Sequence, residues 1–404
     1  MIALQVPARK LVGWLMLVML ALAPAQWSLR VAGGVHLAPA DLLLAAILPL
    51  GVLAGLRPWR LPFAQALFLG AAAVSALLAG DGRDAAKEWM QWALYFWGGT
   101  LLAEASLSWY GGRGLRRAVA VFTGAGGVIV AVAAVQYWRG PLDDPLMVRG
   151  TFGNRNVLGG YLALLLPLAF GLLLQARSLA GRLGLGLLVF AGLSVCLSGP
   201  ALLAIALVLL AQAAWRGRAW LLGTGLVLMV SLTLLAPRLP RMNVYEAFQS
   251  MALYDETGQP TRRYPEWQAA AVMALERPWV GVGPGAYQKR IGAFYGVVPN
   301  ATGPSEPDIQ NLYLVLAASA GLPACAAFLL LLGGGIQAAA ARSLRPPAPV
   351  PAPGWWPGLD VGVAGALAAL AITAVWHPLL VRGIGLPLAL LLAAARRRTI
   401  PSPG

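Results

Sequence analysis

Residues 157–175, VLGGYLALLLPLAFGLLLQ, form an apolar run that no charged residue interrupts. A helix of about 20 such residues crosses the hydrocarbon core of a bilayer, so this run predicts a transmembrane helix. The whole chain of 404 residues has the same character, with 59% hydrophobic and 11% charged residues. Soluble domains carry about 25% charged residues. The composition therefore excludes a soluble globule, a disordered chain and a fibre, and it predicts an integral membrane protein.

Similar apolar runs recur along the chain between charged residues and Gly or Pro breaks, and they predict an all-α polytopic membrane protein with about twelve transmembrane helices. We expect about nine spans in residues 1–236, one large extracytoplasmic loop at 237–308, and about three spans with a cytoplasmic tail in 309–404. Two runs that meet at Ser198-Gly199-Pro200 could instead form one kinked helix. The expected helices lie near 11–28, 35–56, 62–79, 87–107, 115–138, 156–175, 183–198, 200–215, 219–236, 309–341, 359–380 and 383–395.

The basic residues predict the orientation of these helices. The chain has 30 Lys and Arg against 15 Asp and Glu, a formal net charge of +15. When the connections are assigned alternately to two sides, one side holds Arg9, Lys10, Arg57, Arg60, Arg113, Arg116, Arg117, Arg177, Arg182, Arg216, Arg218, Arg342, Arg345, Arg396, Arg397 and Arg398, and the other side's short connections hold Arg30, Arg83, Lys87, Arg139, Arg149, Arg155 and Arg382. Cytoplasmic loops carry the excess of Lys and Arg, so we expect both termini in the cytoplasm and the long loop outside. The charge then signals sidedness, and no nucleic-acid partner is expected.

The N-terminal run, which begins after Arg9-Lys10, imitates a cleavable signal peptide at Ala23-Pro24-Ala25. Because eleven more runs follow with consistent sidedness, we expect an uncleaved first helix.

Metal and disulfide chemistry have little support in the sequence. Cys196 and Cys325 lie inside apolar runs, and His36 and His377 lie in different spans or at their edges. No group of carboxylates has the spacing of metal ligands. We therefore expect no metal and no cofactor, and we interpret His377, which precedes Pro378, as a cap at the membrane interface.

The stretch RGTFGNRN at 149–156 leads directly into the apolar run described first. Its two arginines, with the positive end of a helix dipole beside them, favour an anion such as a phosphate. The alternative is a turn and helix cap in which Arg149 and Arg155 contact lipid headgroups or pair with Asp143 and Asp144.

The long loop holds seven basic and seven acidic residues, so any anion site in it must be local. Arg262 and Arg263 precede Pro265-Glu266, which is a good helix start. Like charges at the positive end of a helix are unfavourable unless an anion joins them. This pair therefore indicates a second anion site, with an ordinary solvated helix start as the alternative.

Two further stretches of the long loop carry weaker signals. GVGPG at 281–285 resembles a phosphate-binding loop only superficially, because no Lys-Ser or Lys-Thr follows in register. EPDIQN at 306–311 comes just before the chain re-enters the membrane, where its carboxylates and amides could bind sugar hydroxyls or act as a general base. The alternative for this second stretch is solvated charge and a helix cap.

Three motifs in this order resemble the O-antigen ligase and polymerase superfamily of membrane glycan ligases. They are RGTFGNRN at 149–156, Arg263-x-x-x-Trp267 followed by ERPWVGVGPG at 276–285, and QNLYLVLAASAG at 310–321. The similarity covers most of the chain in layout and about fifty residues in motif. It implies an enzyme of the bacterial inner membrane that moves a glycan from undecaprenyl diphosphate to an acceptor hydroxyl. The acceptor is lipid A-core in ligases and another lipid-linked repeat in polymerases.

The resemblance also implies roles for individual residues. Arg263 would clamp the diphosphate, and the residues that would help to bind substrate are Arg149, Arg155, Asn156, Arg262, Trp267 and Asn311. The family usually has His-Asn where this chain has Gln310-Asn311, and a glutamine amide takes no proton at neutral pH. We therefore expect Asp308 or Glu306 as the base, with Gln310 and Asn311 orienting the acceptor. The family also often has Ser-Arg where this chain has Ser198-Gly199.

The sequence thus predicts a metal-independent glycosyltransferase of lipid-linked glycans, either ligase or polymerase. Two other classes stay open. A transporter or flippase of a lipid-linked anion would favour charges deep in the spans and an internal repeat, whereas Asp41 and Glu104 are the main intramembrane candidates and no repeat is evident. A catalytically silent partner of a glycan assembly complex would fit the replaced histidine.

Overall fold

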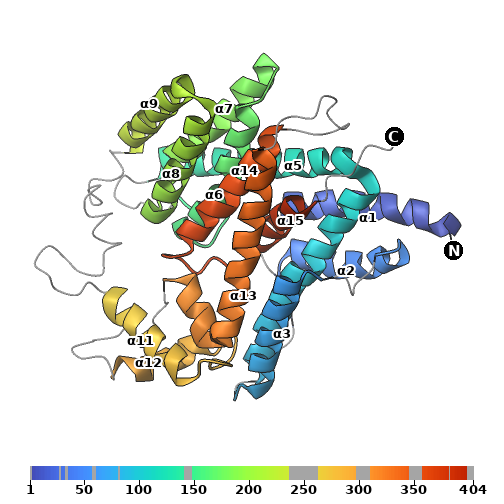
Figure 1. Cartoon of the computed structure of the whole chain (residues 1–404), viewed down its shortest axis with the longest axis vertical. Helices are drawn as coiled ribbons and strands as arrows, with labels where there is room; N and C mark the ends of the chain where they lie inside the picture. The colour runs from blue at the N-terminus through green and yellow to red at the C-terminus, as the bar shows by residue number, and fades with distance from the viewer. Residues whose placement is uncertain are drawn as a thin grey trace, which may run out of the picture.

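The computed structural model describes residues 2–26, 29–31, 35–56, 61–80, 82–140, 148–235, 263–296, 310–344, 357–381 and 383–397. Within these residues the protein is helical apart from one small hairpin, in which β1 (Leu29–Val31) pairs antiparallel with β2 (Val35–Leu37). The helices form an irregular bundle, with α11 and α12 at one end (Figure 1). The predicted all-α class is confirmed, and the hairpin is an addition that the apolar pattern did not reveal.

Each expected apolar run contains at least part of a helix. The expected helix at 35–56 begins only at Pro39, because residues 35–37 belong to the hairpin. Among the described residues, six helices are long and apolar enough to cross a membrane, and the larger number of about twelve stays a prediction. The helices are α1 (Ile2–Leu22), α2 (Pro39–Leu53), α3 (Phe63–Leu78), α4 (Gly82–Ala93), the π-helix η2 (Leu94–Gly99), α5 (Thr100–Arg139), α6 (Arg155–Leu173), α7 (Leu179–Ser194), α8 (Gly199–Arg216), α9 (Arg218–Leu235), α11 (Arg263–Glu276), α12 (Tyr287–Tyr295), α13 (Leu312–Ser343), α14 (Pro357–Thr373) and α15 (Gly385–Arg396).

Glycine and proline divide the long helical stretches. α5 changes direction at Gly111 and α13 at Gly321, both of which have positive φ angles, 55° and 86°. The two runs at Ser198 are separate helices, since α7 ends at Ser194 and Pro200 occupies the first turn of α8. Proline is tolerated in that turn because its missing N–H has no helical partner there.

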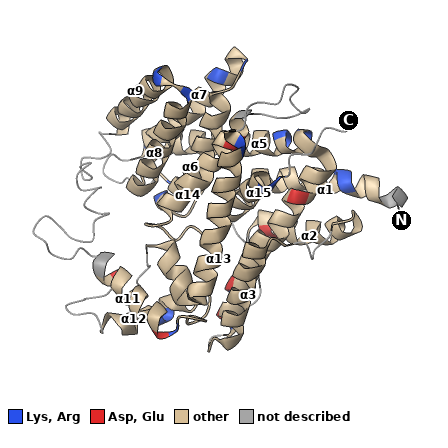
Figure 2. Cartoon of the chain, viewed as in Figure 1, with Lys and Arg blue, Asp and Glu red and all other residues tan. Residues whose placement is uncertain are grey.

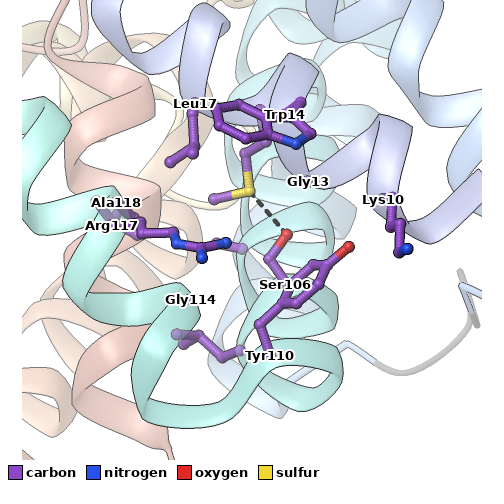
Figure 3. Close-up of a pocket in the computed structure, with 13 residues that line it drawn as sticks. Lys10, Gly13, Trp14, Leu17, Ser106, Tyr110, Gly114, Arg117 and Ala118 are labelled. Atoms are coloured by element: carbon purple, nitrogen blue, oxygen red, sulfur yellow. Dashed lines mark hydrogen bonds between the residues drawn. The ribbon is translucent and has the colours of Figure 1, made fainter. Parts of the chain in front are cut away.

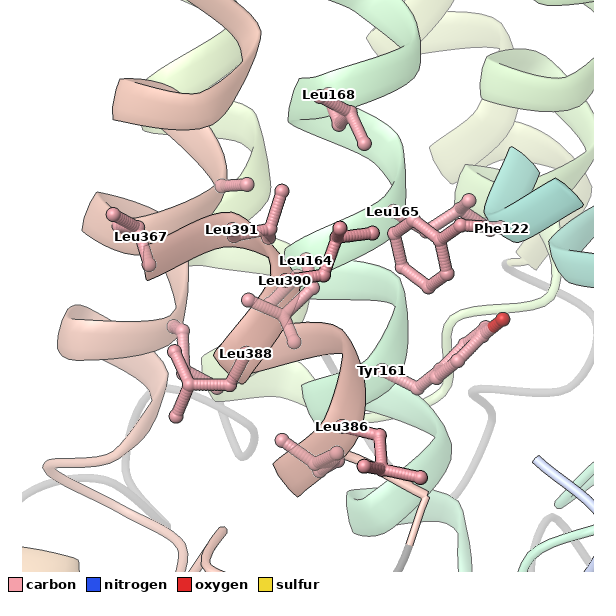
Figure 4. Close-up of a cluster of buried hydrophobic side chains, with 14 of the residues drawn as sticks. Phe122, Tyr161, Leu164, Leu165, Leu168, Leu367, Leu386, Leu388, Leu390 and Leu391 are labelled. Atoms are coloured by element: carbon pink, nitrogen blue, oxygen red, sulfur yellow. The ribbon is translucent and has the colours of Figure 1, made fainter. Parts of the chain in front are cut away.

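α6 lies at the centre of the bundle, and 78% of its apolar window is buried. Figure 4 shows Leu164 and Leu165 of α6 beside Leu390 and Leu391 of α15. The backbones of α6 and α14 meet without intervening side chains, because a Cβ added to Gly171 would lie 2.4 Å from the backbone nitrogen of Gly362. Small residues allow this close approach between membrane helices.

The basic residues gather near the ends of α1, α5, α7 and α9 that lie away from α11 and α12 (Figure 2). Three cations in this half are paired. Asp360 is 1% exposed and accepts hydrogen bonds from Arg342 at 3.0 Å and Arg397 at 2.9 Å, while Arg396 lies 3.7 Å from Glu104. The pairs of Asp360 join the ends of α13, α14 and α15, and the Arg396–Glu104 pair joins α15 to α5.

Candidate functional site

The loop before α6, which contains the first predicted motif, is held by hydrogen bonds from α5 and from the segment that follows α1, and by a ring contact with α6. The Gln136 side chain of α5 accepts from the amides of Arg149 and Gly150 and donates to the Gly150 carbonyl at 2.7 Å. The Thr151 hydroxyl donates to the Pro24 carbonyl at 2.6 Å. Phe152 is buried and packs 5.2 Å from the Tyr161 ring. These contacts therefore fix the conformation of the loop.

Its last residues begin α6 with a side-chain cap. Asn154 Oδ1 accepts hydrogen bonds from the amides of Asn156 and Val157. Arg149 is exposed and reaches the Gly153 carbonyl at 3.5 Å, whereas Arg155 and Asn156 are half-buried on the first turn. The structure thus brings the three predicted binding residues of this motif together at the positive end of α6, with the helix cap supplied by Asn154.

A buried contact between Ser198 and His377 lies beside this helix start. Ser198 is the N-cap position of α8, and its hydroxyl shares a hydrogen bond of 3.1 Å with His377 Nε2. A Cβ added to Gly159 of α6 would lie 2.7 Å from Ser198 Cβ, so α6 and α8 touch at this level. His377 is 2% exposed. The ring is therefore enclosed between helices, and the expectation of a cap at the membrane interface stays a prediction.

The start of α13 lies in the same region, because it is hydrogen-bonded to the residue that follows α14. Asn311 Oδ1 caps α13 by accepting from the amides of Tyr313 and Leu314. The Leu312 amide donates to the Ala374 carbonyl at 2.9 Å, three residues before His377 in the chain. The predicted Gln310 is half-buried at this start, and Asn311 is 6% exposed.

Three helix N-termini, those of α6, α8 and α13, therefore converge around the turn that carries His377. This turn also contacts α6, because a Cβ at Gly160 would lie 2.6 Å from a Leu379 methyl group. Each N-terminus carries about half a positive charge from its aligned peptide dipoles. Together with Arg149 and Arg155 they favour a negatively charged group, and the anion site itself stays a prediction.

The second predicted arginine pair lies at the border of the described residues, and Arg263 alone of the two is described. Arg263 is the first residue of α11, and Arg262, Glu306 and Asp308 lie outside the described residues. Trp267 is half-buried, and its indole N–H has no acceptor among the described residues. α11 packs on the first segment of α13 through a small apolar cluster. The described members of that cluster on α11 and α13 are Ala269, Ala270, Met273, Ala274, Val315, Ala317 and Ala318.

GVGPG at 281–285 has a structural role. The Val282 and Gly283 amides donate to the carbonyls of Ala318 and Ser319 at 2.9 and 2.8 Å, at the kink of α13. Gly281 has φ 63°, and a Cβ there would lie 2.5 Å from the Ser319 backbone. Since these two amides are engaged by α13, this loop fixes α11 and α12 on the bundle, and the expectation that it is no phosphate-binding loop agrees with these contacts.

The Ser198–His377 contact is the feature of this region that sequence reasoning missed. The two residues are 179 positions apart, and no motif contains both of them. The sequence feature that could have indicated this contact is His377, which stands next to Pro378 in an otherwise apolar run. Among the described residues no group of three or more His, Cys, Asp or Glu side chains could hold a metal ion.

A family model described as O-Antigen ligase matches residues 194–329. The matched stretch runs from the end of α7 into α13, so it contains Ser198, Trp267 and Asn311. None of the curated proteins matches the chain. Residues 194–329 are thus similar to the O-antigen ligase family, and this match supports membership of the chain in the O-antigen ligase superfamily.

Proposed function

We propose that this protein transfers a glycan from an undecaprenyl-diphosphate-linked donor to an acceptor hydroxyl at the outer face of the bacterial inner membrane. The observation that carries the proposal is the convergence of three helix N-termini beside Arg149 and Arg155, next to a matched O-antigen ligase domain. A lipid diphosphate is the anion that a membrane-embedded site of this kind suits. Residues 1–236 and 309–404 form the two membrane parts in this proposal, and 237–308 the outer loop.

The diphosphate is the leaving group in this reaction. The acceptor oxygen forms a bond to the anomeric carbon, the bond from that carbon to the diphosphate breaks, and the negative charge stays on the diphosphate. Arginine compensates this charge by paired, charge-assisted hydrogen bonds. We assign this role to Arg263 first, with Arg262, Arg149 and Arg155 as partners and Trp267 and Asn156 as further contacts to the donor.

The acceptor hydroxyl must lose its proton to a base. Gln310 has no proton-accepting group at neutral pH, so the sequence favours Asp308 or Glu306, which precede it, with Gln310 and Asn311 orienting the acceptor. The buried His377 is a second candidate base, because the turn that carries it is hydrogen-bonded to the start of α13. Imidazole accepts a proton near neutral pH.

A reconstituted assay with purified protein and lipid-linked donor tests the clamp. We expect Arg263→Ala to lower transfer by about 100-fold or more, the size typical of removing one electrostatic contact to a developing anion. Arg263→Lys should recover part of the rate, since lysine keeps the charge but not the two-pronged geometry. Arg277→Ala, at an exposed position just after the same helix, is the matched control and should keep full activity. Full activity of Arg263→Ala would overturn the clamp.

Ligase and polymerase differ in the acceptor, and a deletion strain separates them. Loss of chain polymerisation indicates a polymerase whose acceptor is another lipid-linked glycan. Loss of glycan from an otherwise complete lipid A-core indicates a ligase.

The rival classes predict different results in the same preparations. A flippase would move donor across liposomes that contain no acceptor, and a silent assembly partner would show no transfer with either acceptor. Transfer that requires both donor and acceptor supports the proposed enzyme.

A further inference from the structure

A cavity of about 220 Å³ lies between α1, α5 and α15, away from the site described above. The kink at Gly111 creates it by folding the two segments of α5 around Tyr110. The Tyr110 ring covers Gly13 of α1, where an added Cβ would lie 2.8 Å from the ring. Figure 3 shows Arg117 directed towards Ser106 on one side of Tyr110, with Lys10 on the other side.

The charged groups that line this cavity are all positive. Lys10 and Arg117 both line it, and no Asp or Glu is among the described residues that do so. Neither cation has an ion pair within the described part of the chain, whereas Arg342, Arg396 and Arg397 do. The Tyr110 hydroxyl is buried without a hydrogen-bond partner there. Two cations and an unused hydroxyl donor favour an anion with several oxygen atoms.

The remaining walls are apolar and open to the surface of the bundle. Trp14, Leu17, Leu107 and Leu390 line the cavity, and Trp14 is 64% exposed. The neighbouring Arg9 takes no part, because it donates to the Ala54 carbonyl at 3.0 Å and stacks on Trp109. A ligand that fits must therefore carry a charged head for Lys10 and Arg117 and an apolar body beside Trp14.

We propose that this cavity binds the phosphate headgroup of an anionic glycerophospholipid, whose acyl chains extend past Trp14 into the bilayer. The cavity lies near a cluster of basic residues, which the proposed topology places at the cytoplasmic leaflet. That leaflet is rich in anionic lipids, and basic pockets between helices on this side suit their headgroups. The proposal is independent of the glycan-transfer site.

The test titrates the purified full chain in a neutral detergent with phosphatidylglycerol, phosphatidylcholine or inorganic phosphate, and it measures bound lipid by native mass spectrometry and Tm by dye fluorescence. We expect phosphatidylglycerol to bind and raise Tm, and phosphatidylcholine to do neither. In the double variant Lys10→Ala/Arg117→Ala, phosphatidylglycerol should bind roughly thirty-fold more weakly, since each cation near an anionic headgroup supplies about a fivefold effect.

The matched control is Arg177→Ala/Arg218→Ala, which removes the same charge at exposed positions outside the cavity. It should keep wild-type affinity. Equal losses in both double variants would overturn the site, because they would indicate general surface attraction. Equal stabilisation by inorganic phosphate would overturn the assignment to a lipid. Tyr110→Phe, which removes only the hydroxyl, is the milder variant if the double variant fails to fold, and unchanged affinity in Tyr110→Phe would then count against the proposal.

Discussion

At the scale of single residues, the buried His377 beside Ser198 raises the question of which residue takes the proton from the acceptor hydroxyl. A base on the outer loop would be Asp308 or Glu306, and a base within the bundle would be His377.

We predict that His377→Gln lowers kcat by about 100-fold or more if the imidazole takes the acceptor proton. Glutamine can still bond the Ser198 hydroxyl, so the fold should be kept, and an unchanged Tm checks this. The double variant Asp308→Asn/Glu306→Gln serves as the comparison and should keep the wild-type rate. A His377→Gln enzyme with the wild-type rate would return the role to the carboxylates.

The residues at the start of α6 show which parts of the candidate site can be predicted from the sequence. Arg149, Arg155 and Asn156 were predicted from a short polar motif before an apolar run, and the structure places them together at one helix start. Contacts between distant positions leave no local pattern. For that reason the enclosure of His377 was not predicted, although the residue itself was noted.

At the scale of secondary-structure elements, the contact between α6 and α14 holds the site's turn in place. The turn that carries His377 follows α14 directly, and α14 lies against α6 with glycine on both sides. A Cβ at Gly358 would lie 2.1 Å from the Gly171 carbonyl oxygen. A side chain at Gly171 or Gly358 would therefore push one helix backbone away from the other. A backbone cannot move aside as easily as a flexible side chain.

We therefore predict that Gly171→Ala destabilises the protein by about 1–3 kcal/mol or more, the usual cost of overpacking a core. Thermal unfolding in detergent, followed by circular dichroism, measures the change. Gly184→Ala on α7 is the control, because nothing lies within 4 Å of its added Cβ. That control should be neutral or slightly stabilising, since alanine favours helices over glycine. Equal Tm values for the two variants would contradict the packing argument.

Element positions were largely predictable because long apolar runs are a strong signal, and their ends at Gly, Pro and charged residues agree with most helix bounds. Two elements were not. The hairpin at residues 29–37 is too short for an alternating pattern to stand out within an apolar region. The docking of 281–285 on the kink of α13 depends on backbone hydrogen bonds, which side-chain patterns do not report.

At the scale of the whole molecule, the uneven distribution of Lys and Arg predicts one orientation in the membrane. The segment with α11 and α12 lies at one end of the bundle, and the basic ends of α7 and α9 lie away from it. In the proposed topology α12 faces the outside and the start of α7 faces the cytoplasm.

A cysteine-labelling experiment tests this orientation. In a background with Cys196→Ala and Cys325→Ala, we expect Ala293→Cys on α12 to react with a membrane-impermeant maleimide in spheroplasts. Ala180→Cys on α7 should react only after the membrane is opened. Both alanines are exposed, so the two variants form a matched pair. The reverse pattern would invert the topology and place the transfer site on the cytoplasmic side.

The backbone contact between Gly281 and Ser319 also constrains the order of synthesis. Residues 263–296 leave the ribosome before the kink of α13 exists, so the apolar face of α11 that packs on α13 lacks this partner during that interval. Its packing is completed only when residues 312–321 arrive. A nascent chain arrested before α13 should therefore expose this segment to protease, and the finished chain should protect it.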